Sequence, residues 1–300
     1  MQAKTATMTV KLSDVRSDAS GFEQLAVVAQ SLEGGSDRAI EVDFSQCNFF
    51  DANMAAPLGA ILARARSHPE TLKIQGLNPH VGTIFSKNEF LSDYALEKST
   101  TSPGFASIPG KQFSTRDSHS FADYLTRNLQ DESLPSMPAS VYDKLKRSSL
   151  EIFANAALHS ESECGIFSCG QHLPAEHTVG LTVADAGIGM RQKIVKELGL
   201  RLRSDKAIAW AVQEGNTTRK GNIPGGLGLQ LIKEFVVGNR GRLQIISDRG
   251  LWRIDRFGES TERLSRPLPG TTINIAINTS VLQLNRSTAT LTPSNQEVRQ

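Results

Sequence analysis

The stretch EIFANAALHS, residues 151–160, places Glu151, Asn155 and His159 four residues apart in a segment otherwise rich in apolar residues. A spacing of four brings side chains to one face of a helix, about one turn apart. Such a polar stripe is either solvated or faces a cleft in which something charged is held. The residues around it are needed to choose between these two interpretations.

The flanking sequence predicts a domain of long strands and helices. A helix is expected over about 138–160, with Pro138 acceptable near its start, and helical material over about 191–213. A further helix is expected at LQLIKEFVVGN, and strands at GIFSCG, TVGLTVA, RLQIISD, LWRIDRF and TTINIAIN. Strands joined largely by hairpins, with helices gathered on one face, indicate an α+β two-layer sandwich.

The first part of the chain alternates between strand and helix patterns. Strands are expected at TMTVKL, AIEVDFS and TLKIQGL, and helices at FEQLAVVAQSL, MAAPLGAILARAR and HVGTIFSKNEFL. This order predicts an α/β domain whose helices pack on a small sheet. We therefore expect a domain at 1–97, a linker at 98–119 rich in Ser, Thr, Pro and Gly, a second domain at 120–279, and a polar, disordered tail at 280–300.

Composition narrows the class of protein. The formal net charge of the 300 residues is +2 and 39% are hydrophobic, so nothing indicates a nucleic-acid partner. No apolar run approaches the roughly 20 residues that cross a bilayer, and the first residues lack the long apolar segment expected of a secretory signal. The three cysteines form no CxxC pair, which argues against a disulfide scaffold or a zinc site. A cytoplasmic protein without a membrane partner is expected.

Two glycine-rich motifs carry most of the chemistry. VADAGIGM (183–190) puts Asp185 after an apolar strand, and PGGLGLQLIK (224–233) puts glycines before a helix. Glycines at a helix N-terminus expose backbone N–H groups that suit phosphate, although each motif alone is also compatible with a tight turn or a mobile loop. The spacings fit neither a Walker loop nor a Rossmann fingerprint.

The order of these elements is more specific than any one of them. Residues 140–278 resemble the GHKL ATP-binding fold shared by gyrase, heat-shock chaperones, histidine kinases and MutL. Glu151 and Asn155 match its N box, DAGIGM matches its first glycine box, and GGLGL matches its second. The resemblance covers about half of the chain and implies a cleft for Mg²⁺ and ATP.

Residue chemistry gives each matched position a role. The Asn155 amide oxygen is a suitable Mg²⁺ ligand, and Glu151 can take a proton from water or from a serine hydroxyl near the γ-phosphate. Asp185 can accept from the adenine amino group, where guanine would present an acceptor. His159 is expected to have a structural or metal-orienting role. With Glu151 as the catalytic candidate and Asn155 as the metal ligand, the predicted nucleotide-binding residues are Asn155, Asp185, Gly187, Gly189, Met190, Thr217, Thr218, Arg219, Gly226, Leu227, Gly228, Leu229 and Lys233. Of these, Thr217, Thr218 and Arg219 lie in the breaker-rich segment 214–226, which is expected to close over the phosphates.

The first domain bears a second resemblance. AIEVDFSQCNFFDANMAAPLGAILARAR (39–66) is similar to the STAS domain of anti-anti-sigma factors, over about 6–95. In those factors a serine in an Asp-Ser-Ser-Gly turn accepts phosphate from a GHKL kinase. The turn here reads Asp51-Ala52-Asn53-Met54, with no hydroxyl at either matching position, so we expect no phosphoswitch. Asn53 either holds a fixed docking state against the second domain or marks a fold without a switch.

Together these features predict a regulatory ATP-binding protein, acting as a slow ATPase or a nucleotide-gated interaction switch with another protein as partner. An anti-sigma-like serine kinase acting on a separate STAS partner, and a module that keeps ATP as a structural ligand, remain alternatives. His119 lacks the surroundings of a phosphoacceptor histidine, which disfavours a histidine kinase. Relatives with this fold often form homodimers, but the sequence fixes no interface.

Overall fold

The protein, described from a computed structural model, has two domains that pack closely against each other. The structure describes residues 7–33, 39–65, 72–86, 107–218 and 227–280. The predicted tail lies outside these ranges, except for Ser280. Within them, no helix combines the length and the hydropathy needed to cross a membrane.

The N-terminal domain alternates between strand and helix, as its sequence predicts. Its elements are β1 (Thr7–Lys11), α1 (Ala19–Leu32), β2 (Ala39–Asp43), the short 3-10 helix η1 (Ala52–Met54), α2 (Ala55–Arg64), β3 (Leu72–Gln75) and α3 (Pro79–Ser86). The strands form a parallel sheet in the order β1-β2-β3. Asp18 caps α1 by accepting a hydrogen bond from the Gly21 N–H at 3.0 Å.

The C-terminal domain is built on a five-stranded antiparallel sheet in the order β4-β5-β6-β8-β7. Its strands are β4 (Ser107–Phe113), β5 (Ile166–Leu173), β6 (Thr178–Asp185), β7 (Arg242–Asp255) and β8 (Gly258–Asn278). Its helices are α4 (Ser118–Leu129), α5 (Ala139–His159), η4 (Pro174–Glu176), α6 (Gly189–Leu198), α7 (Ser204–Ala211) and α8 (Leu227–Gly238). The α/β and α+β fold class predicted for the two domains is confirmed.

The expected linker at 98–119 is wrong for part of its length. Residues 107–113 form the edge strand β4 on β5, and α4 begins at Ser118. The pairing register shifts between Ile108 and Lys111, where Pro109 and Gly110 interrupt the ladder. Proline and glycine are tolerated at an edge-strand irregularity, but they hide the alternation that would identify a strand.

RLQIISD and LWRIDRF, expected as two strands, form the single strand β7. The irregularity between them lies at Asp248 and Gly250, where the β7–β8 register shifts. Asp248 has a φ of 54°, in the left-handed region. A bulge of this kind bends a strand without ending it, and the outer part of the hairpin reaches α8, where Glu259 pairs with Lys233 at 3.2 Å.

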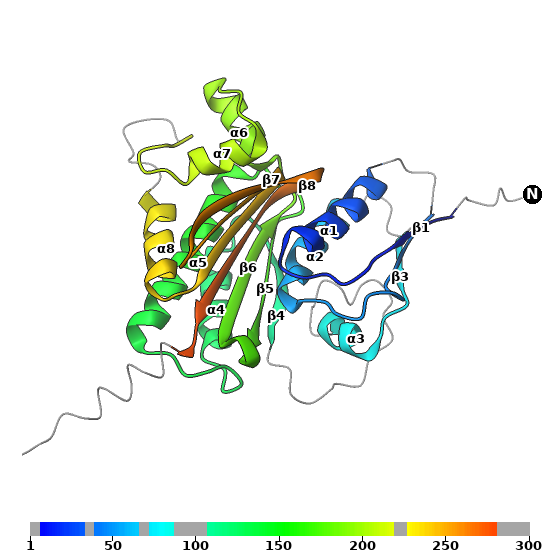
Figure 1. The fold of residues 1–300 in the computed structure, drawn as a ribbon, viewed down its shortest axis with the longest axis horizontal. Coiled ribbons are helices and arrows are strands. Elements are labelled where there is room, and N and C mark those ends of the chain that lie inside the picture. Colours follow the sequence, from blue (N-terminus) through cyan, green and yellow to red (C-terminus); the bar gives the residue numbers. More distant parts are fainter. Residues whose placement is uncertain (1–6, 34–38, 66–71, 87–106, 219–226, 281–300) are drawn as a thin grey trace, which may run out of the picture.

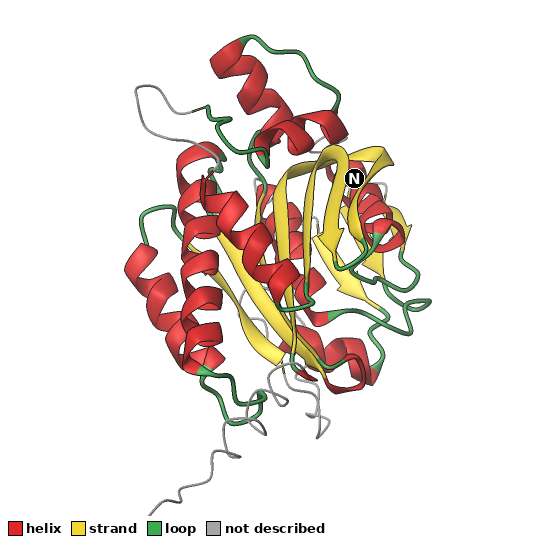
Figure 2. Cartoon of the chain, turned by 60° about the vertical axis from the view of Figure 1, so that its left-hand side comes forward, coloured by secondary structure: helices red, strands yellow, loops and turns green. Residues whose placement is uncertain are grey.

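Four layers stack through the molecule. Helices α1 and α2 lie between the small and the large sheet, and α4, α5 and α8 cover the opposite face of the large sheet (Figure 1). The turned view in Figure 2 shows α6 and α7 as a separate pair beyond one end of the large sheet. Neither face of the large sheet is therefore left to solvent at its centre.

Helix α2 has no polar face over most of its length. All eight residues from Ala55 to Leu62 are buried. A helix that is apolar on every side is one that is covered on every side, and α2 is enclosed because it packs between two sheets. Its small side chains allow close approach: the Ala56 N–H donates to the Cys169 Sγ of β5 at 3.2 Å.

Strand β6 separates two hydrophobic cores. Val183 belongs to the core under α4, α5 and α8. Ala184 and Ala186 belong to the core that also contains α1 and α2. Successive residues of a strand point to opposite faces, so the N-terminal domain packs directly behind Asp185.

A row of polar side chains crosses the large sheet on the side of the N-terminal domain. Thr182 and Asn274 are direct partners on β6 and β8, and Gln244 of β7 is paired with Asn274. Asn274 Oδ1 accepts from Asn53 Nδ2 at 3.3 Å and also from the Thr182 hydroxyl. Asn53 Oδ1 accepts from the Ser17 hydroxyl at 2.8 Å. Buried polar groups need such partners, so the row fixes one register of docking.

Ala56→Leu is expected to lower the free energy of unfolding by about 1–3 kcal/mol, because the larger side chain has no space between α2 and β5. Urea unfolding measures this. Ala154→Leu, at an exposed position of α5, is the matched control and should change stability by less than about 0.5 kcal/mol. Equal effects at both positions would contradict the enclosed position of α2.

Candidate functional site

A cleft opens between α5, α6, α8 and the large sheet, with about 1010 Å³ of empty space that includes the solvent at its open mouth. Its floor includes Val183 and Asp185 of β6 and Thr271 and Ile273 of β8. These residues are cross-strand pairs, Asp185 with Thr271 and Val183 with Ile273.

The polar stripe of α5 faces this cleft. Glu151, Asn155 and His159 all line it, so the stripe is not an ordinary solvated face. Asn155 Nδ2 donates to Glu151 Oε1 at 3.3 Å, which leaves the Asn155 amide oxygen on the other side of the same group. His159 Nδ1 lies 3.4 Å from the Thr218 hydroxyl, and Thr217 also lines the cleft.

The first turn of α8 closes the cleft opposite α5. The helix begins at Leu227, and Gly228 and Leu229 line the cleft. A Cβ at Gly228 would overlap the side chain of Glu151, so the glycine lets the Glu151 carboxylate lie directly against α8. The N–H groups of this first turn have no partner within the helix. A carboxylate and a helix N-terminus therefore face the same space.

Asp185 is the buried carboxylate of the floor, with 4% of its surface exposed. Its Oδ1 accepts from the Gly187 N–H at 2.9 Å. Burial raises the pKa of Asp185 to about 7, while hydrogen bonds from the backbone of Gly187 and Thr271 act in the opposite direction. A ligand that donated a hydrogen bond would favour the ionised form. Asp185 is thus suited to recognise a donor on an otherwise apolar ring.

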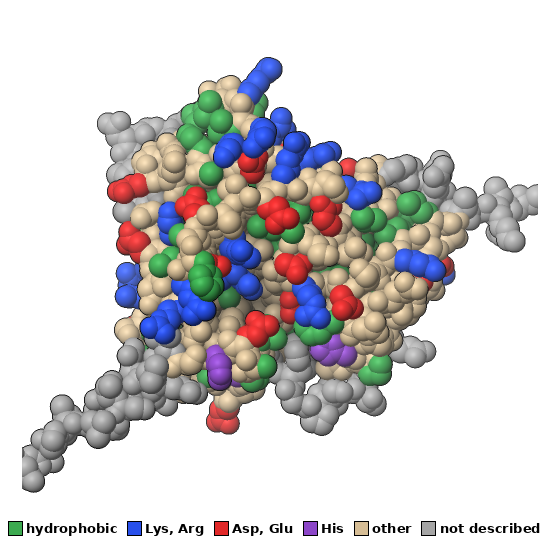
Figure 3. All heavy atoms as spheres, in the orientation of Figure 1, with side chains coloured by type: hydrophobic (Ala, Val, Ile, Leu, Met, Phe, Trp, Pro, Cys, Tyr) green, Lys and Arg blue, Asp and Glu red, His purple; other side chains and the backbone are tan. Residues whose placement is uncertain are grey.

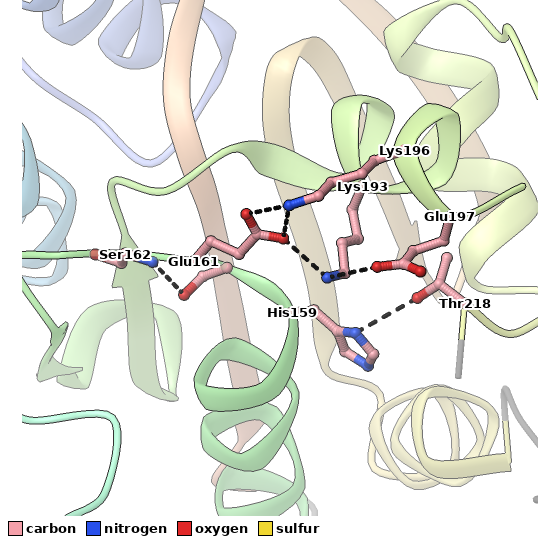
Figure 4. A network of polar contacts seen from close by, with 8 residues as sticks. His159, Glu161, Ser162, Lys193, Lys196, Glu197 and Thr218 are labelled. Carbon is pink, nitrogen blue, oxygen red and sulfur yellow. Dashed lines mark hydrogen bonds and ion pairs between the residues drawn. The ribbon is translucent and has the colours of Figure 1, made fainter. Parts of the chain in front are cut away.

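Gly189 and Met190, two of the predicted nucleotide-binding residues, begin α6 and also line the cleft. Lys193, one turn further along α6, also lines the cleft but is not among the predicted residues. Figure 4 shows its side chain between Glu161 and Glu197. Its Nζ lies 3.0 Å from Glu161 and 3.2 Å from Glu197, and 13% of its side chain is exposed. Burial alone would lower the pKa of Lys193, but the hydrogen bonds to Glu161 and Glu197 raise it above its ordinary value. The cleft therefore contains a cation whose charge is held by two carboxylates.

Some predicted residues lie elsewhere. Lys233 does not line the cleft and instead pairs with Glu259. Gly187 is buried behind the lining, where its backbone packs against Ser160. Arg219, Gly226 and most of the segment 214–226 lie outside the described residues, as does the side chain of Leu227.

Further lining residues were missed by the sequence reasoning. They include Trp210, Asn216, Thr271 and Ile273. Helical spacing after Gly189 could have indicated Lys193, but Thr271 depends on the β6–β8 register, which no local pattern gives. Within the described ranges, no group of three His, Cys, Asp or Glu side chains could hold a metal ion.

Charges outside the cleft are mixed. Acidic and basic side chains lie interspersed on the face shown in Figure 3. Near the cleft, Arg191 lies 3.7 Å from Asp248, and Arg203 lies 3.0 Å from Asp205. Each of these arginine charges is therefore partly offset by a neighbouring carboxylate.

One comparison identifies the N-terminal part. A family model described as "Mlab, STAS domain" matches residues 1–89, the range that contains the parallel sheet and helices α1 to α3. The N-terminal domain is a STAS domain. No curated protein matches the chain. STAS domains usually contact other proteins, so the match indicates a regulatory role for this domain.

The turn at 51–54 of the STAS domain is buried against the second domain. Asp51 Oδ1 accepts from Gln171 Nε2 at 3.1 Å, and the Ala52 N–H donates to Gln171 Oε1 at 2.7 Å. Asn53 is 6% exposed and makes its contact with Asn274 across the same interface. The turn thus lies in a docking contact within the chain, the first of the two alternatives considered for Asn53.

Asn53→Asp is expected to destabilise the protein by about 2–3 kcal/mol at pH 7, because a buried carboxylate would face the Asn274 oxygen without a donor. Chemical unfolding measures the loss. It should shrink in acid, where the protonated carboxyl can donate again. Asn48→Asp, at an exposed position of the same domain, is the control. A loss at position 53 no larger than that at position 48 would contradict the contact.

The raised pKa of Asp185 predicts a pH dependence of stability. Between its ordinary value of 3.8 and about 7, the folded chain keeps a proton that the unfolded chain has released. The contribution of Asp185 to the unfolding free energy therefore declines as pH rises through this window, and is level above it. Asp185→Asn should remove this decline and be relatively more stable at pH 8. The difference between the variant and the wild type should be measured at pH 4.5, 6 and 8, with Asp143→Asn at an exposed position as control. A difference that does not change with pH would refute the assignment.

Proposed function

We propose that the cleft binds ATP with Mg²⁺ and that the chain is a regulatory protein whose STAS domain is joined to a GHKL-type nucleotide-binding domain. The observation that carries the proposal is the meeting of three separate motifs at one cleft. Glu151 and Asn155 on α5, Asp185 at the end of β6, and Gly228 on α8 are far apart in sequence, and all of them line the same space.

The residues fit the ligand by their chemistry. The apolar floor and walls suit a flat base, and Asp185 provides an acceptor for an exocyclic amino group. The first turn of α8 offers N–H groups to phosphate oxygens. Asn155 supplies a neutral oxygen ligand for Mg²⁺, whose remaining ligands would come from phosphate and water. The Mg²⁺ would neutralise phosphate charge when bound.

Glu151 gives the site a means of removing a proton. Its carboxylate lies beside Asn155 and against Gly228, where it can accept a proton from a water molecule or from a serine hydroxyl. We favour slow hydrolysis coupled to a change in protein binding. The STAS domain of this chain presents Asn53 rather than a hydroxyl at its turn, so a serine kinase activity would need a separate partner.

The proposal is tested with ATP and GTP binding in excess Mg²⁺. ATP is expected to bind, and GTP at least about tenfold more weakly, because an acceptor would face Asp185. Asp185→Asn should weaken ATP binding by about tenfold to a hundredfold, the loss of a charged hydrogen-bond acceptor. The exposed Asp143→Asn should bind as the wild type does. Since Asp185→Asn is not expected to unfold the protein, weaker binding would report on the site itself.

The fate of γ-labelled ATP separates the alternatives. An ATPase switch releases free phosphate, and Glu151→Ala abolishes the release, whereas Glu132→Ala at an exposed loop does not. Transfer to serine would place the label on an added STAS protein. Tight binding with neither product would leave ATP as a structural ligand. Absence of ATP binding by the wild type would refute the proposed function.

A further inference from the structure

The STAS domain reaches the loop that follows Asp185. Arg64, the last residue of α2, donates from Nη1 to the carbonyl oxygen of Ala186 at 2.9 Å, and the same nitrogen lies 3.5 Å from the carbonyl of Gly187. The two carbonyls belong to the peptide groups directly after the floor carboxylate. A side chain of one domain thus bonds to the backbone of the candidate site in the other.

The loop has little freedom while this contact is made. The Gly187 N–H donates to Asp185 Oδ1 at 2.9 Å, and the Ile188 N–H donates to the Ser160 carbonyl at 2.8 Å. A Cβ at Gly187 would overlap the Ser160 oxygen, so the loop lies directly on the end of α5. Arg64 and Ser160 therefore hold the peptide groups of this loop through its carbonyls and its N–H groups.

The packing of Ala186 also links the STAS domain to the floor of the cleft. Ala186 is 5% exposed and packs in the hydrophobic core that contains α1 and α2. Its neighbour Asp185 points to the opposite side, into the cleft. A second contact, from the Cys164 thiol to the Ala60 carbonyl at 3.9 Å, joins α2 to the segment after α5. Helix α2 therefore contacts the segment after α5 as well as the loop after β6.

We infer that Arg64 is a positioning residue through which docking of the STAS domain sets the orientation of Asp185, and with it the affinity of the cleft for nucleotide. This inference rests on the proposed function for its nucleotide, but not for the mechanical link. Coupling between two sites is reciprocal. A nucleotide that needs Asp185 in this orientation therefore strengthens docking of the STAS domain, and a partner that displaced the STAS domain would weaken nucleotide binding.

Arg64 is exposed over much of its surface, so its bond to Ala186 competes with water. We therefore expect a change of several-fold rather than a complete loss. In Arg64→Ala, the dissociation constant for ATP should rise on the order of fivefold. The amides of Gly187 and Ile188 should exchange with deuterium faster, also on the order of fivefold, in the protein without nucleotide. Arg64→Lys keeps the charge and a donor and should restore part of both effects.

Arg266→Ala is the matched control. Arg266 also crosses the interface, but its Nε donates to the Gln30 side chain of α1 at 2.9 Å and not to the loop. A general loosening of the interface would raise amide exchange and the dissociation constant for ATP in both variants. A positioning role for Arg64 would raise them in Arg64→Ala alone. Unfolding midpoints of all variants should be measured, so that exchange is compared between proteins that are folded to the same extent.

The two readouts separate the failure of the inference from the failure of the proposed function. Unchanged amide exchange in Arg64→Ala, or equal changes in Arg266→Ala, would overturn the positioning role. Faster amide exchange with an unchanged affinity for ATP would contradict the coupling but not the proposed nucleotide site. If the wild type bound no ATP, the proposed function and the coupling would fail together, and faster exchange in Arg64→Ala alone would still support the mechanical link.

Discussion

The structure depends on burying both faces of the large sheet at once. One face is covered by helices of its own domain, and the other by α1 and α2 of the STAS domain. Strand β6 shows the constraint most directly, because the successive residues Val183 and Ala184 enter different cores. The same alternation places Asp185 in the cleft while its neighbours Ala184 and Ala186 contact the STAS domain. The floor of the site and the interface are consequently two sides of one strand.

The order of the elements could be predicted because each has a strong local pattern. The four-residue spacing in α5 and the apolar runs of β5 and β6 depend only on nearby residues, and the structure agrees with them. Strand β4 could not be recognised, because Pro109 and Gly110 break its alternation and only pairing with β5 makes it a strand. The local pattern likewise predicts two strands where β7 is one, because the bulge at Asp248 interrupts the alternation. Where long-range pairing overrides local preference, a single sequence carries no readable signal.

The candidate site divides in the same way. Glu151, Asn155, Asp185 and Gly228 were found because each belongs to a short motif with a physical reason for its spacing. Thr271 faces Asp185 only through the register of β6 and β8, whereas Lys193, four residues after Gly189 on α6, could have been indicated by helical spacing. The apolar spacing of MAAPLGAILARAR correctly predicts the helix α2. Its position between two sheets explains why no polar side appears, and that position was not readable from the sequence.

The buried thiol of Cys169 gives the protein an internal reporter. Its Sγ accepts from the Ala56 N–H at 3.2 Å and lies 3.3 Å from the carbonyls of Ala52 and Asn53, all across the interface. Burial raises the pKa of this thiol to about 12, so the reactive thiolate is scarce while the two domains are packed together. Cys169 can meet an alkylating reagent only when the STAS domain moves off the sheet. The rate of alkylation at Cys169 therefore reports on the opening of this interface.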